Sequence, residues 1–294
     1  TIQIRAGNFV LRGAGRDKTT LVMKDPNLPI DPAVFYSSPL MIDFKHNSSF
    51  SPDGSPDVTK NVKKGAFSVE VSNASSLKVD SWVVLSVQNN DPAYVAEELK
   101  EGKVVAGELG PDHDINKNGV KVYEYHQIKS IEGNVVTFYE PIHHDVDVNY
   151  KNFTGNGCYN WKVMNYPHYE NVGIEDLTFK GNSKSNFTHH ASWEDDGAFK
   201  PLGMTRLTNS WLRRVRFTSV SEACSVTNCA NVSVYDVIFD GNRGHSSIRS
   251  QVSTRVFIGA TTDRSNGYLV DNASACVEGA GQYHAVGGSK PAIG

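Results

Sequence analysis

Three nine-residue stretches of this sequence follow one pattern: Asn171-Val-Gly-Ile-Glu-Asp-Leu-Thr-Phe179, Asn209-Ser-Trp-Leu-Arg-Arg-Val-Arg-Phe217 and Asn231-Val-Ser-Val-Tyr-Asp-Val-Ile-Phe239. Each begins with Asn and ends with Phe eight positions later, and a looser fourth copy begins at Arg255. Apolar and polar residues alternate within each copy, which is typical of a β-strand with one buried face. A recurring strand of this kind predicts a repeat protein.

The spacing of the copies predicts how the repeats are stacked. The second and third copies begin 22 residues apart, and the first and second begin 38 apart, which equals one repeat plus an insertion supplied by residues 183–198. A unit of this size cannot bury its own apolar face, so successive units must stack. We therefore expect a right-handed parallel β-helix. In it, the repeated Asn would form a stacked turn and the repeated Phe a stack in the core.

Residues 66–148 depart from the repeat. Strand-like runs there are separated by Gly133-Asn134, a dipeptide typical of a β-hairpin turn. We expect the first coils of the β-helix in residues 1–65, an inserted antiparallel β module with a long loop in residues 66–150, and the main coils in residues 151–294. The abrupt beginning and end of the chain favour a piece of a longer protein, cut short at its C-terminus.

The composition excludes some classes of function. The chain has 294 residues, a net charge of −3 and no strongly basic stretch, so we expect no nucleic-acid partner. It contains no apolar run of about 18 residues, so no membrane span is expected either. We expect a monomer.

The repeat register places ionisable side chains in one column. Lys162, Lys200 and Glu222 lie nine residues before the Asn of each copy, and His245 follows one repeat later with a slip of one residue. Lys and Glu are rarely buried without partners, so the column is expected on the surface, as a substrate groove or as a series of ion pairs between coils. His168, just before the first copy, could flank such a groove or belong to a turn.

This column suits β-elimination of a uronate-containing polymer. The reaction needs a group that neutralises the carboxylate and a group that removes the neighbouring proton. Lys200 or Arg214 could do the first, and His245 or Lys200 the second. Arg243 and Arg249 would add positive charge one coil beyond Glu222.

The insertion at residues 183–198 carries His189-His190 and Trp193-Glu-Asp-Asp196 directly before Lys200. Trp193 could stack on a sugar ring. Glu194 and Asp196, with the Asp between them, could bind Ca²⁺ or supply the carboxylate pair of a hydrolase. The alternative is an acidic surface loop.

A second possible metal site lies in the expected module. Asp112, Asp114 and Asn116 alternate as the oxygen ligands of calcium-binding loops do, but the acidic residue expected at the twelfth position is missing. The alternative is a hairpin turn at Asn118-Gly119. Calcium is therefore a possible cofactor, and no other cofactor is indicated.

Three stretches resemble the pectin-lyase-like superfamily of parallel β-helix proteins. Leu11–Leu21 reads LRGxGxxxTxL, Trp82–Ile142 contains WVVLS…IKSIEGNVVTFYEPI, and Asn171–Phe179 reads NVGIEDLTF. The resemblance implies the β-helix fold and a carbohydrate-active protein. The superfamily includes polysaccharide lyases, glycoside hydrolases, epimerases and phage tailspikes, and the sequence carries no complete catalytic signature that selects one of them.

Taken together, the residues and the resemblance favour a polysaccharide-degrading enzyme that is secreted, periplasmic or at the cell surface. A lyase acting on a uronate-containing or sulfated polysaccharide is the first interpretation. A glycoside hydrolase that uses the acidic residues is the second. A non-catalytic carbohydrate-binding β-helix, like a tailspike or adhesin, is the third.

Overall fold

In a computed structural model, residues 1–101, 115, 118–155, 157–267 and 270–273 are described. The chain divides into two compact units. Among the described residues, one is built from residues 1–47 and from those that follow residue 167, and the other from residues 48–167. Each unit has its own apolar core.

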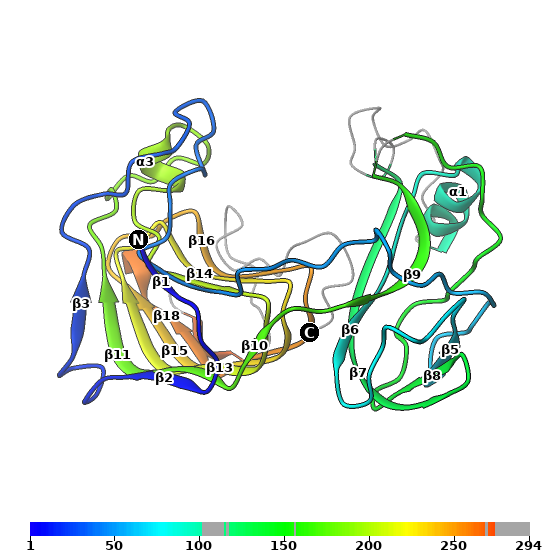
Figure 1. The fold of residues 1–294 in the computed structure, drawn as a ribbon. Helices are drawn as coiled ribbons and strands as arrows, with labels where there is room; N and C mark the ends of the chain where they lie inside the picture. Colours follow the sequence, from blue (N-terminus) through cyan, green and yellow to red (C-terminus); the bar gives the residue numbers. More distant parts are fainter. Residues whose placement is uncertain (102–114, 116–117, 156, 268–269, 274–294) are drawn as a thin grey trace. The chain divides into compact units, whose positions relative to one another are not determined.

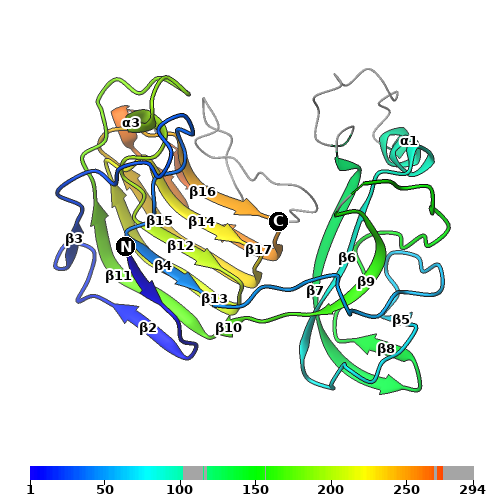
Figure 2. The ribbon, with the colours of Figure 1, turned by 45° about the horizontal axis from the view of Figure 1, so that its top comes forward.

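The first unit is a stack of parallel coils with two sheets. The first sheet has the strand order β1-β4-β12-β14-β16, and Figure 2 shows the last four strands side by side. Its pairings are parallel throughout. The strands are β1 (Ile2–Ile4), β4 (Ile42–Lys45), β12 (Leu202–Thr205), β14 (Glu222–Thr227) and β16 (Ser246–Gln251).

The second sheet contains the repeated sequence segments, which form β11, β13 and β15 (Figure 1). β2 and β3 pair with β11 on one side, β17 and β18 pair with β15 on the other, and β10 pairs with β13, all in parallel, while β19 joins β18 antiparallel. The strands are β2 (Phe9–Arg12), β3 (Thr20–Val22), β10 (Tyr169–Glu170), β11 (Val172–Lys180), β13 (Leu207–Thr218), β15 (Ala230–Asp240), β17 (Thr254–Gly259), β18 (Thr261–Asp263) and β19 (Val270–Ala273). The predicted parallel β-helix is confirmed.

The core lies between the inner faces of the two sheets. Phe179, Phe217 and Phe239 are at most 1% exposed and stack with ring centroids 5.4 and 5.8 Å apart. Each Phe occupies the same register position in its coil. The predicted phenylalanine stack is therefore confirmed, and it ties neighbouring coils together by burial of aromatic surface.

The repeated Asn marks a corner of the coil where the backbone turns. Asn171, Asn209 and Asn231 have φ values between 50° and 57°, in the left-handed region that Asn tolerates better than most residues. The side-chain amide of Asn171 donates to Asn8 over 2.9 Å, and that of Asn231 donates to Asn209 over 3.0 Å. The predicted stacked turn is present, and its hydrogen bonds run along the solenoid.

The insertion of residues 183–198 lies between β11 and β12. Lys180 pairs with Thr218 and Leu202 pairs with Cys224. The chain advances 22 residues from Lys180 to Leu202 but only six from Thr218 to Cys224, so the first of these connections is sixteen residues longer. The extra residues include the short helix α3 (Trp193–Asp196). Figure 2 shows α3 beside the end of the first sheet where β16 begins.

The second unit is an antiparallel sheet with the order β5-β8-β7-β6-β9. It comprises β5 (Ser68–Glu70), β6 (Trp82–Asn89), β7 (Val120–Glu132), β8 (Val135–Phe138) and β9 (Tyr159–Asn165), with helix α1 (Pro92–Glu101). The unit spans 48–167, wider than the expected 66–150, because β9 pairs with β6 and residues 57–62 bridge to the same core. Within the described residues, none of the helices combines the length and the apolar character that crossing a bilayer requires.

Candidate functional site

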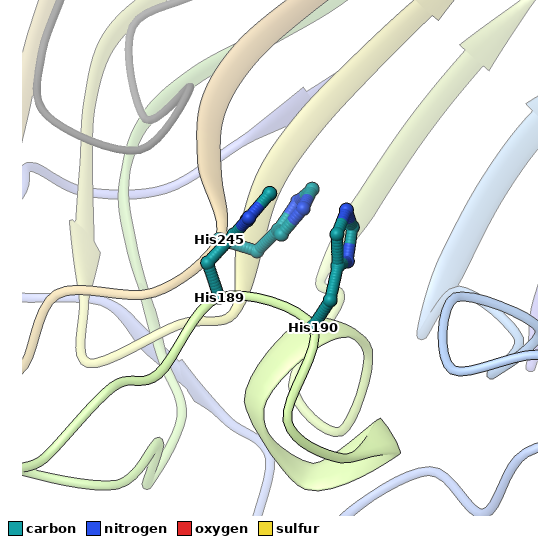
Figure 3. Close-up of side chains that lie close together, drawn as sticks. All are labelled: His189, His190 and His245. Atoms are coloured by element: carbon teal, nitrogen blue, oxygen red, sulfur yellow. The ribbon is translucent and has the colours of Figure 1, made fainter.

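Three histidines meet at the end of the first sheet. His189 and His190 belong to the insertion before α3, and His245 directly precedes β16 (Figure 3). The ring centroids of His189 and His190 are 3.7 Å apart, and each lies 5.1 Å from that of His245. One nitrogen from each ring lies within 4.8 Å of the others. We refer to these three residues as the histidine cluster.

A buried carboxylate orients His190. Asp196 is fully buried at the end of α3, and its Oδ2 lies 2.5 Å from Nδ1 of His190, while its Oδ1 accepts a hydrogen bond from the backbone N–H of His190 over 3.1 Å. A carboxylate beside Nδ1 favours a proton on that nitrogen. The lone pair of Nε2 is then free to accept a proton or to bind an ion.

Asp195 holds the insertion in shape and is committed to that role. It accepts hydrogen bonds from the Ser192 hydroxyl (2.6 Å), the Thr188 backbone N–H (3.2 Å) and Lys184 Nζ (3.1 Å). Burial opposes ionisation, but these donors together lower the pKa of Asp195 below its ordinary value. Asp195 and Asp196 thus both stabilise the local structure of the insertion.

His245 is placed by close packing between two coils. A Cβ on Gly244 would lie 2.3 Å from the carbonyl oxygen of Val220, so only glycine permits this approach. His245 is 6% exposed, and its Nε2 has no hydrogen-bond partner among the described residues. Burial lowers the pKa of its imidazole; Asp196 and Glu222 oppose that shift, and the other two rings reinforce it.

Glu222 and Arg249 form an ion pair on the first sheet. Glu222 begins β14, is 3% exposed, and accepts a hydrogen bond from the Ser225 hydroxyl. Arg249 Nη1 lies 3.7 Å from Glu222 Oε2, and the Arg249 side chain is 35% exposed. The carboxylate therefore lies beside the guanidinium of a side chain that is partly exposed, and a guanidinium suits contact with an anionic group.

Lys200 lies in register with Glu222, as predicted, because Leu202 pairs with Cys224. It is 9% exposed, and its Nζ donates to the backbone carbonyl of Tyr36 over 3.2 Å. His245 is offset from this column by one position, since Glu222 pairs with Ser246.

Two predicted residues lie elsewhere in the fold. Lys162 belongs to β9 of the antiparallel unit and pairs with Asp57 over 2.6 Å, so its predicted place in the column is wrong: the chain before the first repeat belongs to the module. Arg214 lies in the second sheet, where it pairs with Asp176 (2.6 Å) and Glu175 (2.8 Å). It therefore does not share the sheet of Lys200.

The remaining candidates each have surroundings of their own. Trp193 is half-buried and packs against the small apolar cluster that contains Phe199, while Glu194 is exposed and pairs with Lys184 over 3.1 Å. Arg243 pairs with Asp263 over 3.4 Å, and His168 is half-buried directly before β10. Asp112, Asp114 and Asn116 lie outside the described residues.

Asp43 is a residue that the sequence reasoning missed. It lies in β4 in one row with Gly203, Ser225 and Arg249 on successive strands. Asp43 is 9% exposed, its Oδ1 has no partner among the described residues, and burial raises the pKa of its carboxyl. Strand alternation could have found it, because Ile42 and Phe44 on either side point into the core.

Comparisons with known proteins match the chain to solved structures. No protein-family model matches the chain, and no curated protein does. Among solved structures, the chain is similar to the tailspike gp61 of Pseudomonas phage phi297, with a TM-score of 0.42 and 10% identity over 91% of this chain and 37% of the other.

Two further tailspikes are similar to the chain. The tailspike Gp54 of Acinetobacter baumannii bacteriophage AP22, solved in complex with an A. baumannii capsular saccharide, gives a TM-score of 0.41 and 10% identity over 90% of this chain and 45% of the other. The tailspike gp49 of Pseudomonas phage LKA1 gives a TM-score of 0.28 and 12% identity over 89% of this chain and 54% of the other. The chain thus spans 37–54% of the length of these proteins.

Proposed function

We propose that this chain cleaves an anionic polysaccharide by β-elimination at the histidine cluster, outside the cell. One observation carries the proposal: three imidazoles, one of them backed by the buried Asp196, meet at the end of the sheet on which Glu222 pairs with the partly exposed Arg249. Neutral imidazoles are suited to accept protons near pH 7, and a guanidinium is suited to bind carboxylate or sulfate.

The first sheet supplies a surface for an extended chain of sugars. Asp43, Gly203, Ser225 and Arg249 lie in register on successive strands, about 4.8 Å apart from coil to coil, and three of the four carry a polar side chain. A row of polar groups across stacked strands suits a polymer better than a single small molecule.

The reaction follows from these groups. Arg249 would pair with the uronate carboxylate and increase the acidity of the proton on the adjacent carbon. An imidazole of the histidine cluster accepts that proton, the C–H electron pair forms the new C=C bond, and the bond to the glycosidic oxygen breaks. The departing oxygen takes a proton from solvent.

A glycoside hydrolase has less support from the carboxylates. Hydrolysis needs two that are free to act as acid and as base or nucleophile. Asp195 and Asp196 are engaged within the insertion, and Glu194 pairs with Lys184. Glu222 is tied to Ser225 and Arg249. We therefore place the lyase first.

The product identifies the reaction. The protein is incubated with a panel of uronate-containing, sulfated and capsular polysaccharides while ultraviolet absorbance and reducing ends are recorded. We expect one polymer to yield an unsaturated uronate chromophore together with new ends. New ends without the chromophore would replace the lyase by the hydrolase, and binding without cleavage would replace both by a carbohydrate-binding protein.

The role of Arg249 is tested with the polymer found in this way. Arg249→Met should lower the cleavage rate by at least tenfold. Arg213→Met is the matched control, because Arg213 is also a partly exposed arginine paired with a glutamate but lies in the second sheet. Equal rates for the two variants would remove Arg249 from the mechanism.

A further inference from the structure

We propose that the histidine cluster binds a divalent transition-metal ion, zinc being the first to test, through one imidazole nitrogen each of His189, His190 and His245. Figure 3 shows the three rings gathered at one point, two from the insertion and one from the start of β16. The ion would thus join two segments that are far apart in the sequence.

The geometry lies close to that of a bound ion. The three candidate nitrogens lie within 4.8 Å of one another. Around a zinc ion with Zn–N distances of about 2.0–2.1 Å, ligand nitrogens are separated by roughly 3.4 Å in a tetrahedron. His189 is exposed, so rotation of its side chain can bring its ring nitrogen closer to the other two.

The environment of two of the rings points to a ligand. His245 is 6% exposed with Nε2 lacking a partner among the described residues, although buried polar atoms in proteins are nearly always satisfied. The Asp196–His190 contact of 2.5 Å is the carboxylate–histidine arrangement that orients metal-bound imidazoles and raises their basicity.

The ligand set selects the kind of ion. Three imidazole nitrogens suit zinc, copper, nickel or iron, whereas calcium and magnesium prefer oxygen ligands. Three protein ligands leave a fourth position open, as in catalytic rather than structural zinc sites. The site would therefore hold a water molecule that can be displaced or deprotonated.

This inference deepens the proposed function: the role of the zinc in cleavage rests on the proposed lyase activity, whereas the binding of zinc does not. A zinc-bound water has a pKa of about 7 and is deprotonated at neutral pH. With the three imidazoles occupied as ligands, such a hydroxide would replace the imidazole as the base, and the rest of the elimination would be unchanged.

Zinc binding is measured directly on the full chain. The protein is stripped with a chelator, dialysed and titrated with Zn²⁺ by calorimetry, and its metal content is determined by mass spectrometry. We expect one ion per chain and a higher melting temperature with zinc. Each of His189→Gln, His190→Gln and His245→Gln should weaken binding by at least tenfold, and Asp196→Asn by about 10–100-fold. His168→Gln, outside the cluster, should bind as the wild type does.

The outcomes separate this inference from the proposed function. Circular dichroism of the metal-free variants shows whether each remains folded. No stoichiometric zinc, or zinc binding that the cluster variants leave unchanged, would overturn the metal site. If the metal-free protein nevertheless forms the unsaturated product, the lyase stands and the imidazoles act alone. If zinc binds and no polymer in the panel is cleaved, the metal site stands and the lyase falls.

Discussion

The charged residues of the two sheets differ in what they are paired with. On the first sheet, the side chain of Arg249 is partly exposed and pairs with Glu222 over 3.7 Å. On the second sheet, Arg214 has φ of 53° and donates to both oxygens of Asp176, so its side chain is used to stabilise the corner of the coil. The same residue type thus contributes to a binding surface at one position and to stability at the other.

This pairing predicts how stability depends on pH. Hydrogen bonds from Arg214 lower the pKa of Asp176 from 3.8 to about 2. A lowered carboxyl pKa stabilises the fold fully above pH 3.8 and loses that effect as the pH falls through 2. Arg214→Met should cost about 1 kcal/mol at pH 7, allowing for solvent screening, and less towards pH 2. Urea unfolding at a series of pH values measures this, and a cost independent of pH would contradict the assignment.

The histidine cluster could be predicted only in part at this scale. His189 and His190 stand in a polar insertion, and the sequence places His245 near Glu222 through the repeat register. The approach of His189 and His190 to His245 depends on the path of the insertion, which Asp195 and Asp196 set by accepting hydrogen bonds from within it. The sequence interpretation treated these carboxylates as ligands or as an acidic surface, because their burial comes from long-range packing.

At the scale of the element, the turns at the corners stabilise the coil together with the strands. The repeated Asn supplies a residue that tolerates positive φ and an amide that bonds to the next coil. Asn231 donates to Asn209 and accepts from Arg255 Nε over 2.7 Å. This explains why the period could be derived from the sequence: a stacked corner demands the same residue in successive coils.

Asn231 provides a test of this corner. Asn231→Ala loses the hydrogen bonds and places a Cβ-bearing residue without a polar side chain at φ of 54°, so we expect a cost of about 2 kcal/mol. Asn231→Gly loses only the hydrogen bonds and should cost about 1 kcal/mol. Equilibrium denaturation of both variants distinguishes the two contributions, and equal losses would show that backbone conformation contributes nothing.

The extent of the antiparallel element was less predictable than its existence. Alternating strands and the Gly133-Asn134 turn identify the hairpin of β7 and β8. β9 carries a similar alternation and stands just before the first repeat, so the sequence interpretation assigned it to the coils. Which strand β9 pairs with depends on tertiary contacts, and the alternation of apolar and polar residues along β9 does not reveal its partner β6.

At the scale of the whole molecule, the chain leaves the solenoid at residue 48 and returns at residue 168. His46 and Tyr169, on either side of this excursion, lie with ring centroids 4.6 Å apart. The coil is therefore closed by contacts of its own, and each unit buries a separate core.

This organisation predicts that the solenoid unit tolerates loss of the module. Replacing residues 48–167 by a short Gly-Ser linker should leave a folded protein that binds zinc with unchanged affinity, since the histidine cluster and its carboxylate lie in the first unit. Circular dichroism and zinc titration of the shortened chain measure this. An unfolded product would show that the coils depend on the module.

The central claim, that the histidine cluster is where the polymer is cleaved, is tested most directly by the rate of unsaturated product formation in His190→Gln. General acid–base groups contribute on the order of 10²–10⁴-fold to a rate, so we expect a loss of at least a hundredfold relative to the wild type. His144→Gln should retain the wild-type rate, because His144 lies in the antiparallel unit, where it pairs with Glu98. A folded His190→Gln protein that cleaves the polymer as fast as the wild type would place the reaction elsewhere.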